Sequence, residues 1–323
     1  MRAISYQTVD VTILGFKANL SKFKGKIVSN LNQLLIEKNA KYKVMYIECI
    51  LSNIDSIITG KPDDIKKLKK NFDDITKSVN KESKSYKNFI KKIITALEYE
   101  KRRSDFYPRY FHQIGIKSCV YCNAHLTVAI EEKVKLIRKT RIDYTAKFQV
   151  DHFLPKADYP CFSVSLYNLY PVCANCNIAK SKSAVDFNLY LDEHSITSSS
   201  FEFTLAKGSV ANYLTTRNIE NIQYKFSEPS VVPPTKTFQE VFKIQEIYDT
   251  QKDIAEELIL KAEIYTQKYK DSLKKQFPEL FINEGIFNRL LLGNYSTEEQ
   301  IHNRPMAKFT MDIAKQVGLI KKK

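Results

Sequence analysis

Two short cysteine pairs, Cys119-Val-Tyr-Cys122 and Cys173-Ala-Asn-Cys176, decide how the middle of the chain folds. Two residues between the cysteines let both sulfurs turn towards one ion, and two such pairs complete a tetrahedral, all-thiolate zinc site. In a reducing compartment such pairs bind metal more often than they form disulfides. We therefore predict a structural zinc ion bound by Cys119, Cys122, Cys173 and Cys176.

The remaining cysteines and histidines carry weaker signals. Cys49 falls in an apolar helical pattern and is expected in the core, whereas Cys161 is a spare that fits neither pair. His125 lies close to Cys122 in sequence, so it stays an alternative metal or substrate contact. The other histidines outside the motif described below are expected to be surface or structural residues: His112, His194 and His302.

Length and charge narrow the class of protein. The chain has 323 residues, 43% of them hydrophobic, which is typical of a globular protein with a sizeable core. Its formal net charge of +15 favours a polyanionic partner, most simply nucleic acid, although a lysine-rich genome gives the same bias. We find no run of about 18 apolar residues that would span a membrane. The first residues include Asp10 and lack the apolar segment of a signal peptide, so we expect the cytoplasm.

Hydrophobic spacing divides the chain into three regions. Residues 1–105 are predicted to be mainly helical, with a stop-and-restart signal at Gly60-Lys61-Pro62-Asp63 and a short β element around Val9–Leu14. Residues 106–230 contain the two cysteine pairs and strand-like runs at 126–130 and 148–150. Residues 231–323 are predicted to be helical again, over 238–277, 284–293 and 297–317. The fold class expected is α+β, a small zinc-stapled domain between two mainly α-helical regions.

A second motif lies between and beside the cysteine pairs. It consists of Val150-Asp151-His152-Phe153-Leu154-Pro155-Lys156, followed by Tyr167-Asn168-Leu169-Tyr170-Pro171-Val172 directly before Cys173, and by Asn177 and Lys180 after Cys176. A histidine that follows an aspartate at a strand end is a natural general base, because its ordinary pKa lies near neutrality. Adjacent residues of a regular strand point to opposite faces, so a strand end or bulge must bring Asp151 and His152 to one site.

This pattern resembles the HNH endonuclease motif, which is embedded in a zinc-bound ββα-metal fold. Similar units occur in McrA-like restriction enzymes, in the nicking domain of RNA-guided DNA nucleases and in anti-phage defence nucleases. The resemblance covers roughly residues 116–185, less than a quarter of the chain. Asn177 stands where many relatives have histidine, which favours an oxygen-ligated Mg²⁺ or Mn²⁺ over a transition metal.

The resemblance implies a role for each motif residue. His152 would be the general base, and Asp151 with Asn177 would hold one Mg²⁺ or Mn²⁺ ion at the scissile phosphate. Asn168 would hold the His152 backbone or ring in its working orientation. Lys180, one helical turn after Asn177, would reach the same phosphate as a point charge.

Three functions follow from these observations. The first is a DNA endonuclease, which we expect to act with a partner, such as an ATPase of an anti-phage defence operon, because the flanks contain no P-loop or base-reading motif. The second is an RNA-cleaving enzyme of the same type, since such a unit contacts backbone more than bases. The third is a non-catalytic, zinc-dependent nucleic-acid-binding adaptor.

Overall fold

The computed structural model describes residues 1–37, 40–135, 140–196, 199–279, 281 and 283–321. It confirms the α+β class, because the described residues are mostly helical and their strands form small two-stranded sheets. Within these described ranges, no helix is both long and apolar enough to cross a membrane.

Helices dominate the first part of the chain. They are α1 (Tyr6–Gly15), α2 (Lys17–Ile36), α3 (Lys41–Ser52), α4 (Ile54–Thr59), α5 (Pro62–Thr76), α6 (Lys84–Ala96), α7 (Tyr99–Asp105) and α8 (Tyr107–Ile114). The predicted break at Gly60 separates α4 from α5, where a Cβ would lie only 2.1 Å from the Ser56 carbonyl oxygen. Pro62 then begins α5 at a position where a missing amide proton costs nothing.

The β element predicted around Val9–Leu14 is wrong, since these residues lie within helix α1. The Ser5 side chain caps α1 by accepting a hydrogen bond from the Gln7 amide at 3.1 Å. Val9 and Thr12 are buried, three residues apart, so the apolar face has helical spacing. The β-branched residues of this segment favour a strand locally, but packing of the buried face overrides that preference.

The middle of the chain contains the sheets. The strands are β1 (Ile4–Ser5), β2 (Ala129–Lys135), β3 (Thr140–Ala146), β4 (Gln149–His152), β5 (Leu169–Val172), β6 (Tyr190–Leu191), β7 (Glu202–Leu205) and β8 (Tyr224–Ser227). β2 pairs with β3, β4 with β5 and β7 with β8 in antiparallel fashion, whereas β1 and β6 are parallel. The predicted runs 126–130 and 148–150 overlap the starts of β2 and β4. Helices α9 (Ala174–Lys180) and α10 (Ser209–Thr216) also belong to this part.

The last part is helical, but with more breaks than the spacing predicted. The stretch 238–277 forms four helices, α11 (Phe238–Phe242), α12 (Ile244–Asp249), α13 (Lys252–Ile264) and α14 (Gln267–Gln276). α15 (Glu284–Leu292) matches its prediction, whereas 297–317 divides into a 3₁₀ turn (Glu298–Asn303) and α16 (Ala307–Gln316). Lys243 and Met306 cause two of these breaks, because each adopts a left-handed backbone with φ of 53° and 63°.

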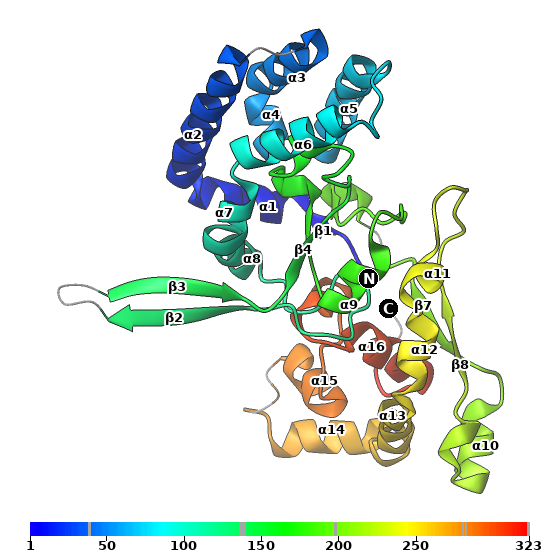
Figure 1. The fold of residues 1–323 in the computed structure, drawn as a ribbon. Helices are drawn as coiled ribbons and strands as arrows, with labels where there is room; N and C mark the ends of the chain where they lie inside the picture. Colours follow the sequence, from blue (N-terminus) through cyan, green and yellow to red (C-terminus); the bar gives the residue numbers. More distant parts are fainter. Residues whose placement is uncertain (38–39, 136–139, 197–198, 280, 282, 322–323) are drawn as a thin grey trace.

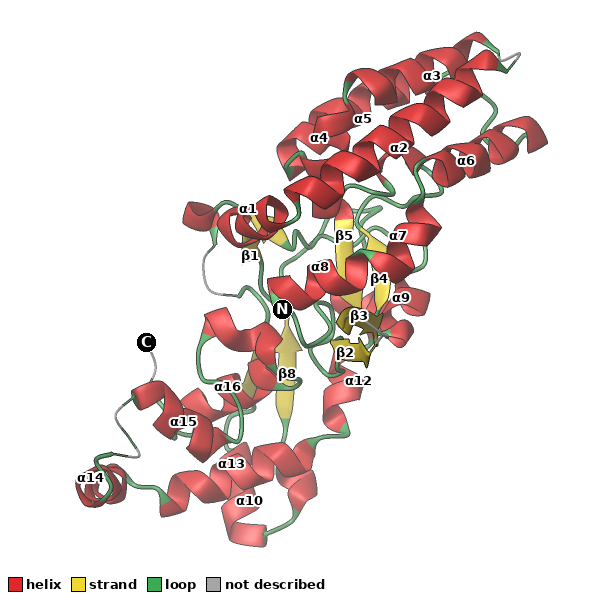
Figure 2. Cartoon of the chain, turned by 90° about the vertical axis from the view of Figure 1, so that its left-hand side faces the viewer, coloured by secondary structure: helices red, strands yellow, loops and turns green. Residues whose placement is uncertain are grey.

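These elements surround a central β4–β5–α9 unit. The N-terminal helices α2 to α6 gather at one end and α13 to α16 at the other, while the β2–β3 ribbon extends away from the body (Figure 1). α7 packs against α8, and α8 packs against the base of the β2–β3 ribbon (Figure 2). Buried apolar side chains from all three predicted regions, such as Phe23, Tyr121 and Phe309, belong to one hydrophobic cluster. The region boundaries at 105/106 and 230/231 stay predictions.

Candidate functional site: a four-cysteine cluster beside a polar cleft

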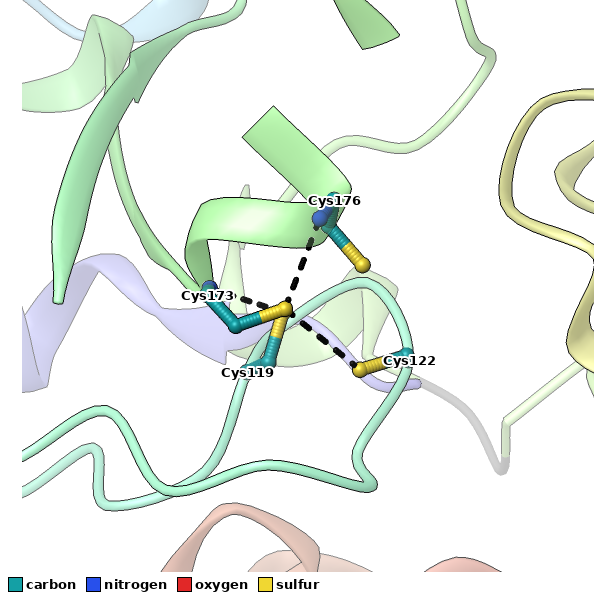
Figure 3. A group of neighbouring side chains, drawn as sticks. All are labelled: Cys119, Cys122, Cys173 and Cys176. Carbon is teal, nitrogen blue, oxygen red and sulfur yellow. Dashed lines mark hydrogen bonds between the residues drawn. The ribbon is translucent and has the colours of Figure 1, made fainter. Parts of the chain in front are cut away.

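The four predicted zinc ligands meet in space. The Sγ atoms of Cys119, Cys122, Cys173 and Cys176 all lie within 4.8 Å of one another, and all four residues are buried (Figure 3). Sulfurs bound to one tetrahedral zinc at about 2.3 Å lie about 3.8 Å apart, and the Cys122 and Cys173 sulfurs are 4.0 Å apart. The cluster therefore fits a structural zinc ion.

Electrostatics explains why four ionised cysteines at these positions would need a cation. Two thiolates about 4 Å apart repel by about 4 kcal/mol at an effective dielectric constant near 20, so four of them exceed about 20 kcal/mol in total. This is more than the whole stability of a typical domain, about 5–15 kcal/mol. Backbone amides offset only part of that repulsion: the Cys173 amide donates to Cys119 Sγ at 3.3 Å, and the Cys176 amide to Cys173 Sγ at 3.5 Å.

The first cysteine pair is held in place from the C-terminal part of the chain. Asn123 directly follows the pair with a left-handed φ of 53°. Its side chain donates to the Ile301 carbonyl at 2.9 Å and accepts from the Lys308 amide at 3.0 Å. Tyr248 donates its hydroxyl proton to the Cys122 carbonyl at 2.8 Å. Residues more than a hundred positions away thus fix the pair, which spacing alone did not predict.

The cysteines and histidines outside the cluster differ in their surroundings. Cys161 is buried and burial raises its pKa, whereas Cys49 is half-buried against the core. The exposed His125 has its Nδ1 atom 3.6 Å from Cys122 Sγ, so it lies beside the cluster without completing it. His302 is buried and its Nε2 atom donates to the Arg2 carbonyl at 2.6 Å.

Asp151 lies at the centre of the second motif. Its Oδ2 atom accepts a hydrogen bond from the Tyr121 hydroxyl at 2.6 Å and faces Lys180 Nζ at 3.0 Å. Both partners use Oδ2, which leaves Oδ1 as a hard oxygen for a cation. Tyr121 was not predicted as a site residue, although its position between two zinc ligands was a usable signal.

Lys180 lies inside the protein, with 1% of its surface exposed. Its ammonium group also donates to the His152 carbonyl at 3.0 Å. Sequence reasoning expected this charge at the substrate phosphate. In the structure it stabilises the buried Asp151 carboxylate and ties α9 to the end of β4.

His152 is the last residue of β4, and its imidazole is held by the backbone. Its Nε2 atom lies 3.1 Å from the Ser163 carbonyl oxygen. A carbonyl only accepts, so Nε2 bears the proton and Nδ1 keeps an unprotonated lone pair. The Tyr99 ring packs at 5.0 Å from the imidazole. The near-neutral pKa expected from the sequence is not what the structure gives: burial lowers the pKa of His152 to about 3, so the ring is neutral at physiological pH.

Asn168 acts on the chain around His152. Its Oδ1 atom accepts from the Leu154 amide at 2.7 Å, and its Nδ2 atom donates to the Leu154 carbonyl at 3.1 Å and to the Phe162 carbonyl at 3.0 Å. Phe162 directly precedes Ser163, whose carbonyl holds the imidazole. Asn168 therefore holds both ends of the segment 154–162, which begins two residues after His152 and ends directly before the Ser163 carbonyl that binds its imidazole.

Three of the predicted residues line one cleft of about 290 Å³, namely Asp151, His152 and Asn177. Asn177 Nδ2 donates to Gln149 Oε1 at 2.6 Å, which leaves the Asn177 amide oxygen for another ligand. Further lining residues, not predicted as site residues, are Tyr99, Arg103, Gln149, Val150, Pro155, Lys156, Ala157, Ser181 and Lys182. Asn168 and Lys180 are not among the residues that line it.

Comparison with known proteins adds no relative, since no family model, no curated protein and no solved structure matches the chain.

Proposed function

We propose that the protein is a metal-dependent endonuclease of the HNH type that hydrolyses phosphodiester bonds in DNA. The observation that carries this proposal is the meeting of Asp151, His152 and Asn177 in one cleft, directly beside a zinc-type cysteine cluster. The order β4, β5, α9 is also the strand–strand–helix order of the ββα-metal unit.

The chain's own residues supply the parts that such a reaction needs. His152 presents a neutral imidazole with an unprotonated Nδ1, so it is in the form that accepts a proton from water. Asp151 and Asn177 would hold the divalent ion through oxygen atoms, as Mg²⁺ and Mn²⁺ prefer. The bound ion would neutralise phosphate charge and stabilise the leaving oxygen. Tyr121 and Lys180 keep the Asp151 carboxylate in place.

The zinc has a separate role in this proposal. Its four positions are filled by cysteine, so it offers no open site to a substrate and serves as scaffold. Cys176 is followed directly by Asn177, so the zinc would fix the part of α9 that faces the cleft.

The test is cleavage of supercoiled plasmid and of a structured RNA by the purified chain with Mg²⁺ or Mn²⁺. We expect DNA cleavage that falls at least about a hundredfold in His152→Ala. His194→Ala is the matched control, because His194 is exposed and does not line the cleft. Equal cleavage by the wild type and His152→Ala would contradict the role of His152, and cleavage of RNA alone would change the substrate. An ATPase partner stays a prediction, tested by co-purification from the native host.

A further inference from the structure

One carboxylate at the rim of the cleft is shared by two cations. Glu100 Oε2 lies 3.6 Å from Arg103 Nη1, and Glu100 Oε1 lies 3.4 Å from Lys156 Nζ. Arg103 and Lys156 line the same cleft as Asp151 and His152. One comes from α7 and the other from the segment after β4, so the two cations converge from different parts of the chain.

Aromatic packing determines how close Lys156, one of the two cations, lies to His152, the proposed base. Lys156 Nζ lies 4.2 Å from the centre of the Tyr99 ring, a cation–π contact. The same Tyr99 ring lies 5.0 Å from the His152 imidazole. The Tyr99 ring therefore contacts both Lys156 and His152. This places Lys156 where it can bind the phosphate next to the one that reacts at His152.

The bonds that Glu100 makes are easily exchanged. The side chains of Glu100, Arg103 and Lys156 are 64%, 52% and 37% exposed. Ion pairs at this exposure contribute little to stability, because water screens them and the side chains lose freedom. A phosphate group presents oxygens to both cations as the carboxylate does, and arginine binds phosphate in a two-pronged geometry.

We propose that Arg103 and Lys156 bind the backbone phosphate next to the scissile one, and that Glu100 competes with that phosphate for both cations. The inference rests on the proposed function of the cleft and specifies its substrate. A chain with at least two consecutive phosphates would fill the site, whereas a diester with a single phosphate would leave the rim empty. The substrate class is therefore a polynucleotide, and Glu100 weakens the binding of every sequence alike.

The experiment compares two substrates, a duplex oligonucleotide and bis(p-nitrophenyl) phosphate, which has only one phosphate. In Arg103→Gln we expect kcat/KM for the oligonucleotide to fall about tenfold more than kcat/KM for the small diester. In Glu100→Gln we expect oligonucleotide affinity to rise about two- to fivefold. Lys101→Gln is the matched control, because Lys101 lies on α7 with the same charge, is 63% exposed and does not line the cleft.

Binding gives a readout that does not depend on catalysis. Removing one phosphate contact lowers the slope of log affinity against log salt by about one, which we expect in Arg103→Gln and not in Lys101→Gln. An equal loss on both substrates in Arg103→Gln, or unchanged affinity in Glu100→Gln, overturns the inference. If the wild type hydrolyses neither substrate while the slope still falls in Arg103→Gln, the proposed function fails and the phosphate site stands.

Discussion

Removing the second cysteine pair tests the zinc site most directly. The variant Cys173→Ala/Cys176→Ala keeps two of the four sulfurs, too few for a closed tetrahedral site. It also removes the cap of α9, because Cys173 Sγ accepts from the Cys176 amide. α9 has only seven residues, and a helix this short is not stable without such anchors.

The size of the effect follows from the zinc and the chain length. Structural zinc contributes about 10 kcal/mol or more to the folding of small zinc domains at neutral pH. For 323 residues the entropy of unfolding is about 0.7 kcal/mol/K, so a loss of about 10 kcal/mol lowers Tm by about 15 °C. The loss is comparable with the entire stability of a typical domain.

The assay combines zinc analysis of the purified protein with thermal unfolding. We expect about one zinc per chain in the wild type and less than about 0.2 in the double variant. Cys161→Ala is the control, because this buried cysteine lies outside the cluster, and we expect full zinc content and a Tm about 1–2 °C lower. A double variant that retains one zinc per chain and the wild-type Tm would refute the assignment of these sulfurs.

Three more predictions concern stability. Lys180→Met leaves the Asp151 carboxylate buried without its cation and should lower the free energy of urea unfolding by about 3 kcal/mol. Adding Asp151→Asn should recover part of that loss. If the double variant recovers nothing, the ion pair is not the cause. Burial lowers the pKa of His302 from 6.5 to about 4. As pH falls, His302 is protonated in the unfolded chain before it is protonated in the folded protein. The free energy of unfolding therefore falls by about 3 kcal/mol as pH drops from 6.5 to 4. His302→Gln should flatten this decline and the exposed His194→Gln should not, while identical pH profiles would argue against the buried histidine. Asn168→Ala breaks three hydrogen bonds to backbone groups and should cost about 2–3 kcal/mol with zinc content unchanged; a smaller loss would mean that water replaces the amide.

The zinc cluster could be predicted from sequence because it depends on local spacing. Two residues between cysteines constrain each pair wherever the pair lies, so only the meeting of the two pairs needed the fold. The second motif was recognisable for a similar reason: Asp151 and His152 are adjacent, and Asn177 is fixed by the neighbouring Cys176. The sequence therefore predicted which residues to examine in the cleft.

The contributions of α7 to the site could not be predicted in this way. Tyr99 and Arg103 lie about fifty positions before His152, and no pattern relates them to it. They reach the cleft only because tertiary packing brings α7 to the end of β4, where the Tyr99 ring lies 5.0 Å from the His152 imidazole. Lys180 shows that spacing along a helix does not predict where a side chain points. Sequence placed it one turn after Asn177, but only packing determined that its side chain points into the protein, towards Asp151.

Asp151 is contacted by residues that lie beside both cysteine pairs. The first cysteine pair contains Tyr121, which donates to the Asp151 carboxylate, and the helix that begins at the second pair ends with Lys180, which binds the same oxygen. Each half of the zinc site thus contributes one group to a residue that would hold the other metal. Because Tyr121 adjoins Cys122 and Lys180 lies one helical turn after Cys176, loss of zinc should disturb Asp151 before the rest of the fold is lost. A zinc ion bound by the four cysteines would not touch the substrate, yet it would determine the geometry of the proposed divalent-ion site.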